Sequence, residues 1–230
     1  MAIKGVLFDF SGTIFRIESA VSALSAVLRE RGIEVAEGEL AAWAERLDAA
    51  GGLPGGTMPQ RMPEHLAELW ETRDIDPERH RAAYTGLSRE AALPWDVHDA
   101  IYDRHMTPAA WAPYPDTAEV LTELRGRGVR VGVLSNIGWD LRPVLRAHGV
   151  ADAVDACVLS YEHGVQKPDP RLFRIACAEL GLEPESVLMV GDDRRADGGA
   201  EAVGCGYLPV DHLPVAQRPE GLRPVLQLAG

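Results

Sequence analysis

Short apolar runs recur along the chain and alternate with segments of helical periodicity. The first run, residues 3–8, ends at Asp9 and is followed at once by Ser11, Gly12 and Thr13. Continuous apolar runs of this length, closed by a polar turn, are typical of parallel strands that are buried on both faces. We therefore expect the chain to open with a buried strand that leads into a polar loop.

Residues 18–114 have a different texture, because Ala, Leu, Glu and Arg dominate and apolar residues recur at helical spacing. Residues 51–63 interrupt this pattern with four glycines and three prolines, which cannot continue a helix. The pattern predicts a helical insertion that contains one long loop, and long loops in compact domains are often functional.

From residue 115 onward, predicted helices and strands alternate strictly. The helices are expected at residues 116–127, 141–148 and 170–180, and the strands at residues 129–134, 154–159, 187–190 and 206–210. Such alternation predicts an α/β fold with a doubly wound parallel sheet. Ligands bind beyond the carboxyl ends of the strands in sheets of this type, so chemistry should be sought there.

Polar residues stand at the places where these strands end. They are Asp9 after the first strand, Ser135 and Asn136 after the second, Lys167 before the next long helix, and Asp192, Asp193 and Asp197 after the fourth strand. Each alone has an ordinary explanation as a turn or capping residue. Together, in this order, they resemble the motifs of the haloacid dehalogenase superfamily.

This resemblance covers nearly the whole chain. It implies a Rossmann-like catalytic core made of residues 1–15 and 113–230, with residues 16–112 as a helical cap domain inserted after the first strand. It also implies a hydrolase, and most simply a phosphatase, in which Asp9 is the nucleophile and forms an aspartyl-phosphate intermediate. A carboxylate can attack phosphorus when its partners neutralise the charge it approaches.

The resemblance implies a magnesium site around Asp9. Asp192, with Asp193 as a nearby candidate, would supply further oxygen ligands, and the backbone carbonyl of Ser11 would complete the set. Asp197 is expected to orient the loop rather than to bind the metal.

The resemblance also implies a phosphate-binding group. Lys167, one of only two lysines in the chain, would keep Asp9 ionised and meet the phosphoryl charge. The remaining expected phosphate contacts come from Ser11, Gly12, Thr13, Ser135 and Asn136.

The chain departs from the phosphatase pattern at Ser11, where related phosphatases carry a second aspartate that serves as general acid and base. A serine hydroxyl cannot take over this role, which is typically worth about 10²–10⁴ in rate. Glu18, His105 or His163 could lend an acid, although each is more simply explained as a surface or helix-end residue.

Three hypotheses therefore remain open. The first is a slow or specialised phosphohydrolase of a small phosphorylated metabolite, which either acts on a good leaving group, such as an acyl phosphate, or borrows an acid from the cap or the substrate. The second is a 2-haloacid dehalogenase, which also lacks the second aspartate but works without a metal and generally lacks the acidic pair found here at Asp192 and Asp193. The third is a phosphate-binding regulatory protein with little turnover.

Composition narrows the partners. A formal net charge of −12 disfavours binding to nucleic acid. The apolar runs are too short to span a membrane and no leader is recognisable, so we expect a cytoplasmic protein, monomeric or homodimeric. Substrate contacts are expected first from Arg16, whose ordinary alternative is a salt bridge to a nearby acid, and from the loop at residues 51–63.

Overall fold

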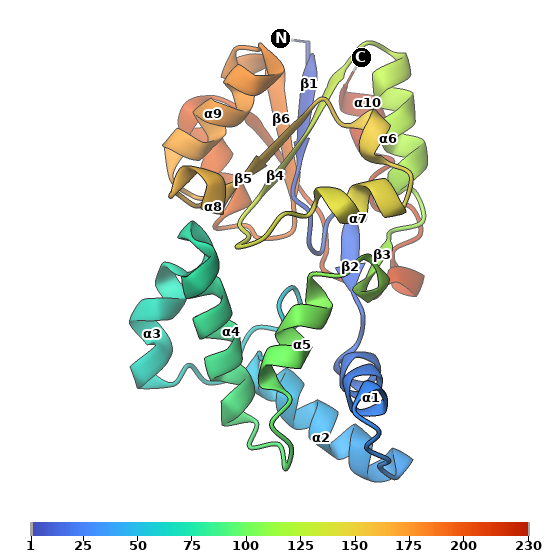
Figure 1. Cartoon of the computed structure of the whole chain (residues 1–230). Helices are drawn as coiled ribbons and strands as arrows, with labels where there is room; N and C mark the ends of the chain where they lie inside the picture. Colours follow the sequence, from blue (N-terminus) through green and yellow to red (C-terminus); the bar gives the residue numbers. More distant parts are fainter. Residues whose placement is uncertain (1, 230) are drawn as a thin grey trace.

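A parallel sheet of five strands forms the centre of the upper lobe in the computed structural model, which describes residues 2–229 (Figure 1). The strand order is β5-β4-β1-β6-β7. The strands are β1 (Gly5–Phe8), β4 (Arg130–Ser135), β5 (Ala156–Leu159), β6 (Val187–Gly191) and β7 (Gly206–Pro209). The predicted α/β fold with a doubly wound parallel sheet is confirmed, and each predicted strand is present within a few residues of its expected bounds.

Helices cover both faces of the sheet, which explains why its strands read as continuous apolar runs. Val6 and Phe8 of β1 pack into the cluster that includes α6, whereas Leu7 between them packs against α9 on the opposite face. The helices of the core are α6 (Thr117–Gly126), α7 (Arg142–Ala147), α8 (Ser160–His163), α9 (Pro170–Leu180) and α10 (Val225–Leu228).

The longest core helix shows how local sequence sets these bounds. Pro170 occupies the first turn of α9, where its missing N–H would have no helical partner, and the side chain of Asp169 accepts a hydrogen bond from the Arg171 amide. Gly181 ends the helix in the left-handed conformation, with φ of 66°. The predicted range for this helix is therefore correct at both ends.

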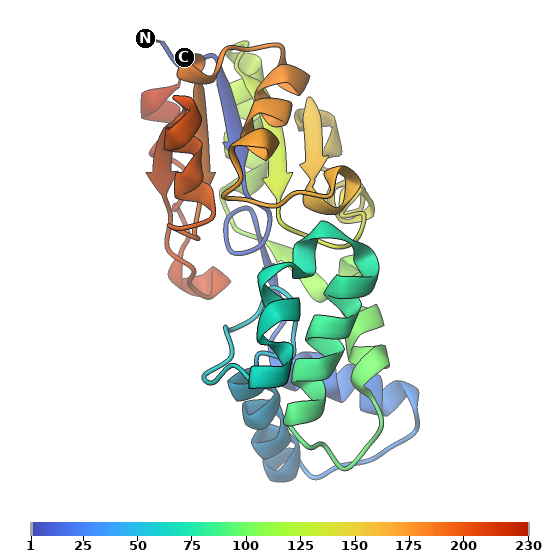
Figure 2. The same cartoon turned by 90° about the vertical axis from the view of Figure 1, so that its left-hand side faces the viewer.

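A second, all-helical lobe lies below the carboxyl ends of the strands (Figures 1 and 2). Its helices are α1 (Ala20–Glu30), α2 (Glu37–Ala50), α3 (Glu64–Glu71), α4 (Pro77–Glu90) and α5 (His98–His105). These elements fall in the segment where a helical insertion was predicted. None of the helices within residues 2–229 is long and apolar enough to cross a bilayer.

A short antiparallel ribbon joins the two lobes (Figure 1). Its strands, β2 (Phe15–Ile17) and β3 (Trp111–Pro113), bring the two ends of the helical insertion together. Sequence analysis missed this ribbon, because three residues per strand are too few to show a period of two. The ribbon places the polar loop after β1 directly beside the helical lobe.

Short 3₁₀ turns complete the architecture. They are η1 (Arg73–Ile75), η2 (Pro108–Ala110), η3 (Ala151–Ala153), η4 (Pro184–Ser186), η5 (Asp197–Val203) and η6 (Val215–Gln217). Of these, η1 contacts α8 and thus touches the core from the helical lobe, and η5 begins at a predicted site residue.

Candidate active site

A cavity of about 610 Å³ lies where the carboxyl ends of the strands face the helical lobe. Its lining includes most of the predicted site residues, namely Asp9, Ser11, Ser135, Asn136, Lys167, Asp192, Asp193 and Asp197. Gly12 and Thr13 are outside this lining. Residues from four separate stretches of the chain thus meet at one edge of the sheet.

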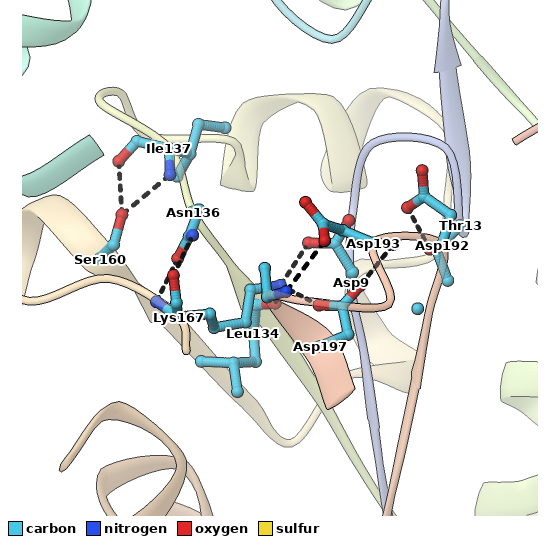
Figure 3. Close-up of polar contacts among 12 residues, drawn as sticks. Asp9, Thr13, Leu134, Asn136, Ile137, Ser160, Lys167, Asp192, Asp193 and Asp197 are labelled. Carbon is cyan, nitrogen blue, oxygen red and sulfur yellow. Dashed lines mark hydrogen bonds and ion pairs between the residues drawn. The ribbon is translucent and has the colours of Figure 1, made fainter. Parts of the chain in front are cut away.

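Lys167 connects the groups at the centre of this site (Figure 3). Its Nζ donates to Asp9 Oδ1 at 2.8 Å, to Asp197 Oδ1 at 2.6 Å and to the Leu134 carbonyl at 2.9 Å. The side chain is almost completely buried. Burial lowers the pKa of Lys167, but Asp197 and Asp9 raise it by more, so its net pKa is above the ordinary value and the ammonium stays charged.

Three carboxylates lie close together beside this ammonium, and two of them bond it. Asp9, Asp192 and Asp197 each offer an oxygen, and these oxygens all lie within 4.8 Å of one another. Burial is the main cause that raises the pKa of Asp9, and it raises that of Asp197 to about 7. A hard divalent cation fits such a set of oxygen donors and would relieve the excess negative charge.

The other two acidic residues of the loop after β6 organise the turn. Asp193 is exposed, and its Oδ1 accepts from the amides of Arg195 and Ala196, each at 2.9 Å. Oδ2 of Asp197 accepts from the Asp193 amide at 3.0 Å. Asp193 is not a member of the three-carboxylate group, so the geometry brings Asp192 rather than Asp193 next to Asp9.

Hydrogen bonds fix the conformation of the loop after β1. Gly12 takes a positive φ of 79°, and its amide donates to the Phe15 carbonyl at 2.7 Å. Thr13 Oγ1 donates to Asp192 Oδ1 at 3.1 Å. A side chain at position 12 would collide with Asp192, whose carboxylate lies 2.4 Å from the place of a Cβ. The loop and the acid after β6 are therefore locked together.

Arg218 braces the same loop from the C-terminal segment. Its guanidinium donates to the carbonyls of Gly12, at 2.6 Å, and Thr13, and it lies over the Tyr114 ring at 3.2 Å from the centroid. The side chain is buried. Sequence analysis missed this residue, because nothing in its local sequence distinguishes it from the other arginines.

The strand-end residues Ser135 and Asn136 serve different parts of the site. Ser135 is buried and lines the cavity. The Asn136 amide donates to the Lys167 carbonyl at 2.9 Å and accepts from the Lys167 backbone amide at 2.7 Å, as Figure 3 shows. Asn136 thus positions the segment that carries Lys167.

His212 and Asp74 also line the cavity, and neither was predicted. His212 Nδ1 lies 2.5 Å from Asp192 Oδ2. Asp74 belongs to η1, is buried, and faces Arg73 Nη2 at 3.4 Å and His80 Nε2 at 3.6 Å. Both residues lie in segments without helical or strand periodicity, so the sequence offered no signal for them.

The three possible acid donors named from the sequence lie in different places relative to the cavity. Glu18 forms a bidentate ion pair with Arg104, at 2.5 and 2.9 Å, and is not among the residues that line the cavity. His163 is exposed on α8, away from the lining. His105 does line the cavity, but burial lowers its pKa to about 3. Its imidazole is therefore neutral near pH 7 and cannot serve as a general acid.

Comparison with known proteins places the chain among relatives with two chemistries. The haloacid dehalogenase-like hydrolase family matches residues 3–204. The chain is 28% identical over 217 residues to (S)-2-haloacid dehalogenase 4A of Burkholderia cepacia, covering 88% of this chain and 80% of that protein. It is 30% identical over 210 residues to glyceraldehyde 3-phosphate phosphatase of Methanopyrus kandleri, covering 88% and 81%.

A solved structure of the same family is similar to this chain over most of its length. L-2-haloacid dehalogenase from Xanthobacter autotrophicus superposes with a TM-score of 0.64 at 25% identity, over 94% of this chain and 81% of that one. The chain therefore belongs to the haloacid dehalogenase-like hydrolase family and is an enzyme of that class. The resemblance drawn from the strand ends is confirmed, but membership alone does not choose between phosphoryl and haloacid chemistry.

The buried His105 gives a prediction about stability. The unfolded imidazole takes up a proton below its ordinary pKa of 6.5, whereas the folded one does so only near pH 3, so the unfolded state binds more protons between these values. Stability present above pH 6.5 is therefore lost as pH falls. At pH 5, His105 alone should cost the wild type about 2 kcal/mol relative to pH 7.

Urea unfolding of wild type and His105→Gln at pH 7 and pH 5 measures this difference, with exposed His163→Gln as the matched control. The free energy of unfolding of His105→Gln should fall less on acidification than that of the wild type, while the control should behave like the wild type. An identical pH dependence in all three proteins would contradict this role of His105.

Proposed function

We propose that the protein is a magnesium-dependent phosphohydrolase that acts on a small phosphorylated metabolite, with Asp9 as its nucleophile. The observation that carries this proposal is the arrangement of Asp9, Lys167 and Asp192. A buried carboxylate is hydrogen-bonded to an ammonium on one side and adjoins a second carboxylate on the other, at the wall of a cavity. Such a group can receive a phosphoryl charge and a divalent cation together.

Each residue has a definite task in this scheme. Asp9 attacks phosphorus, the bond from phosphorus to the substrate oxygen breaks, and the phosphoryl group passes to the Asp9 carboxylate. Lys167 favours the ionised form of Asp9 and lies where the incoming negative charge accumulates. Water then attacks the same phosphorus, so that inorganic phosphate leaves and the carboxylate is restored.

Asp9, Asp192 and the Ser11 carbonyl would hold Mg²⁺, which when bound neutralises charge on the phosphoryl oxygens. Asp197 accepts from Lys167 through one oxygen and from the Asp193 amide through the other, and its task is to position Lys167 and the loop. Ser135, which lines the cavity, would donate to the phosphoryl oxygens, whereas the Gly12 amide is already bonded to the Phe15 carbonyl. A small metabolite suits a cavity of this size.

Ser11 limits which phosphates can be hydrolysed well. Its hydroxyl donates to the Gly55 carbonyl of the loop between α2 and α3 at 3.3 Å, and it carries no carboxyl proton for a leaving oxygen. Without a borrowed acid, alkyl phosphates should therefore be hydrolysed more slowly than acyl or aryl phosphates, whose leaving groups need little protonation.

Dehalogenation is the second candidate, favoured by the missing carboxylate at position 11 and by the similarity to the Burkholderia cepacia dehalogenase. That reaction needs Asp9 but no cation, and so leaves the proximity of Asp192 to Asp9 without a use. Metal dependence therefore separates the two reactions. We favour phosphate chemistry because it uses every charged group at the centre of the site.

The nucleophile and the metal can be tested together. Phosphate release from acetyl phosphate and p-nitrophenyl phosphate should require Mg²⁺, be suppressed by EDTA, and fall at least about 10³-fold in Asp9→Asn, because the attacking group is lost. Asp152→Asn, on the exposed η3 turn, is the matched control and should keep wild-type rates. Turnover that persists in EDTA or in Asp9→Asn would refute the mechanism.

The serine can be tested separately. Ser11→Asp should raise hydrolysis of an alkyl phosphate by at least about 10-fold, through restored leaving-group protonation, and should change aryl phosphate hydrolysis much less. Ser11→Asn has nearly the same size without the acid and should show no gain. If Ser11→Asp folds with an unchanged unfolding midpoint and gains nothing, leaving-group protonation does not limit the enzyme.

A further inference from the structure

The active-site cavity contains polar atoms that lack partners. Within residues 2–229, six buried side-chain nitrogen or oxygen atoms have no hydrogen-bond partner, and four of the six belong to residues that line this one cavity. These four atoms are Arg16 Nη1, Arg73 Nε, His105 Nε2 and His212 Nε2. Buried polar groups are nearly always paired, so a cluster of unpaired ones indicates where a ligand supplies the missing partners.

Of the two arginines among these residues, Arg16 is the one without an ion-pair partner. It stands on β2 of the ribbon, and no carboxylate of residues 2–229 lies within 4.0 Å of its guanidinium, so the salt bridge considered as its ordinary explanation is absent. Arg73, by contrast, has Asp74 at 3.4 Å and donates to the Trp70 carbonyl at 2.7 Å. A buried guanidinium nitrogen with no acid in contact is suited to bind an anionic group of a ligand.

His105 offers the opposite kind of group. Its Nδ1 faces the Tyr102 carbonyl, which can only accept, so the ring proton is on Nδ1 and Nε2 presents a lone pair. Burial keeps this imidazole neutral by lowering its pKa to about 3. The free Nε2 is therefore an acceptor, and its natural partner is a hydroxyl group rather than an anion.

Aromatic rings bound the space around these groups. Trp111 and Trp139 both line the cavity with ring centroids 6.1 Å apart, and Trp111 Nε1 donates to the His105 carbonyl at 2.6 Å. With its own N–H satisfied, Trp111 contributes an apolar wall. The carbon skeleton of a ligand can lie there while polar substituents reach Arg16 and His105.

We propose that the substrate is the phosphate monoester of a hydroxy acid, with a carboxylate bound by Arg16 and a free hydroxyl that donates to His105 Nε2. This inference rests on the proposed phosphohydrolase function and names its substrate class. The phosphate occupies the Asp9 end of the cavity, and Arg16 selects substrates with a second anionic group. Phosphates of neutral alcohols leave Arg16 without a partner.

The proposal is tested by binding in the Asp9→Asn background, where turnover does not interfere. Isothermal titration with Mg²⁺ present compares 3-phosphoglycerate with glycerol 3-phosphate, which lacks the carboxylate, and with 3-phosphooxypropionate, which lacks the hydroxyl. We expect 3-phosphoglycerate to bind at least about 10-fold more tightly than either, as one charge-assisted or buried hydrogen bond allows.

Variants assign the preference to residues. Arg16→Met should remove the advantage conferred by the carboxylate and leave glycerol 3-phosphate binding within about twofold, whereas Arg16→Lys should retain part of it. His105→Phe should abolish the preference for 3-phosphoglycerate over 3-phosphooxypropionate and should leave the preference over glycerol 3-phosphate unchanged. Exposed Arg29→Met is the matched control and should change none of the affinities.

Equal affinities of the Asp9→Asn protein for the three probes, or no binding of any probe, would overturn the proposal. This comparison does not require the Arg16 and His105 variants to fold. A loss of all three affinities in a folded Arg16→Met would also overturn it, since Arg16 would then act on the phosphate or on the structure. The phosphohydrolase function is tested separately: if it is wrong, the wild type will show no Mg²⁺-dependent release of phosphate.

Discussion

The buried ammonium of Lys167 is the constraint on which the rest of the site depends. A lysine removed from water is costly unless each of its three protons finds an acceptor, and here Asp9, Asp197 and the Leu134 carbonyl supply three. These contacts fix the proposed nucleophile Asp9, the loop after β6 and the end of β4 relative to one another. Lys167 bonds two of the three clustered carboxylates, Asp9 and Asp197, so the cluster with Asp192 retains a negative excess that suits a divalent cation.

The fold meets this constraint by bringing four chain segments to one edge of the sheet. β1, β4 and β6 are neighbours, so the residues after them converge, and Asn136 joins the Lys167 segment to β4 through paired hydrogen bonds. Arg218 holds the loop after β1 from outside. The helical lobe then closes the cavity through the ribbon and through the loop that contacts Ser11. The charged groups and the cover of the cavity are thus provided by separate parts of the chain.

Sequence reasoning located the sheet and the strand-end residues, because burial on both faces leaves continuous apolar runs and any polar residue that closes such a run is conspicuous. It could not find Arg218, His212 or Asp74, since these reach the site from irregular segments whose positions are set by tertiary packing. It also could not tell that His105 lines the cavity whereas His163 is exposed. The strand-end pattern thus predicts the chemistry of the core, while the surroundings that select the substrate depend on how the helical lobe packs against it.

The most direct test of the central claim is to identify the group that becomes attached to Asp9. The enzyme would be quenched in acid during turnover of p-nitrophenyl phosphate with Mg²⁺ and, in parallel, during incubation with (S)-2-chloropropionate without metal, and the peptide that carries Asp9 would be analysed by mass spectrometry. The account predicts a hydroxylamine-sensitive phosphoryl group on Asp9 in the first sample and an unmodified peptide in the second. An alkyl ester on Asp9 from the haloacid, with no phosphoryl adduct from the phosphate ester, would contradict it.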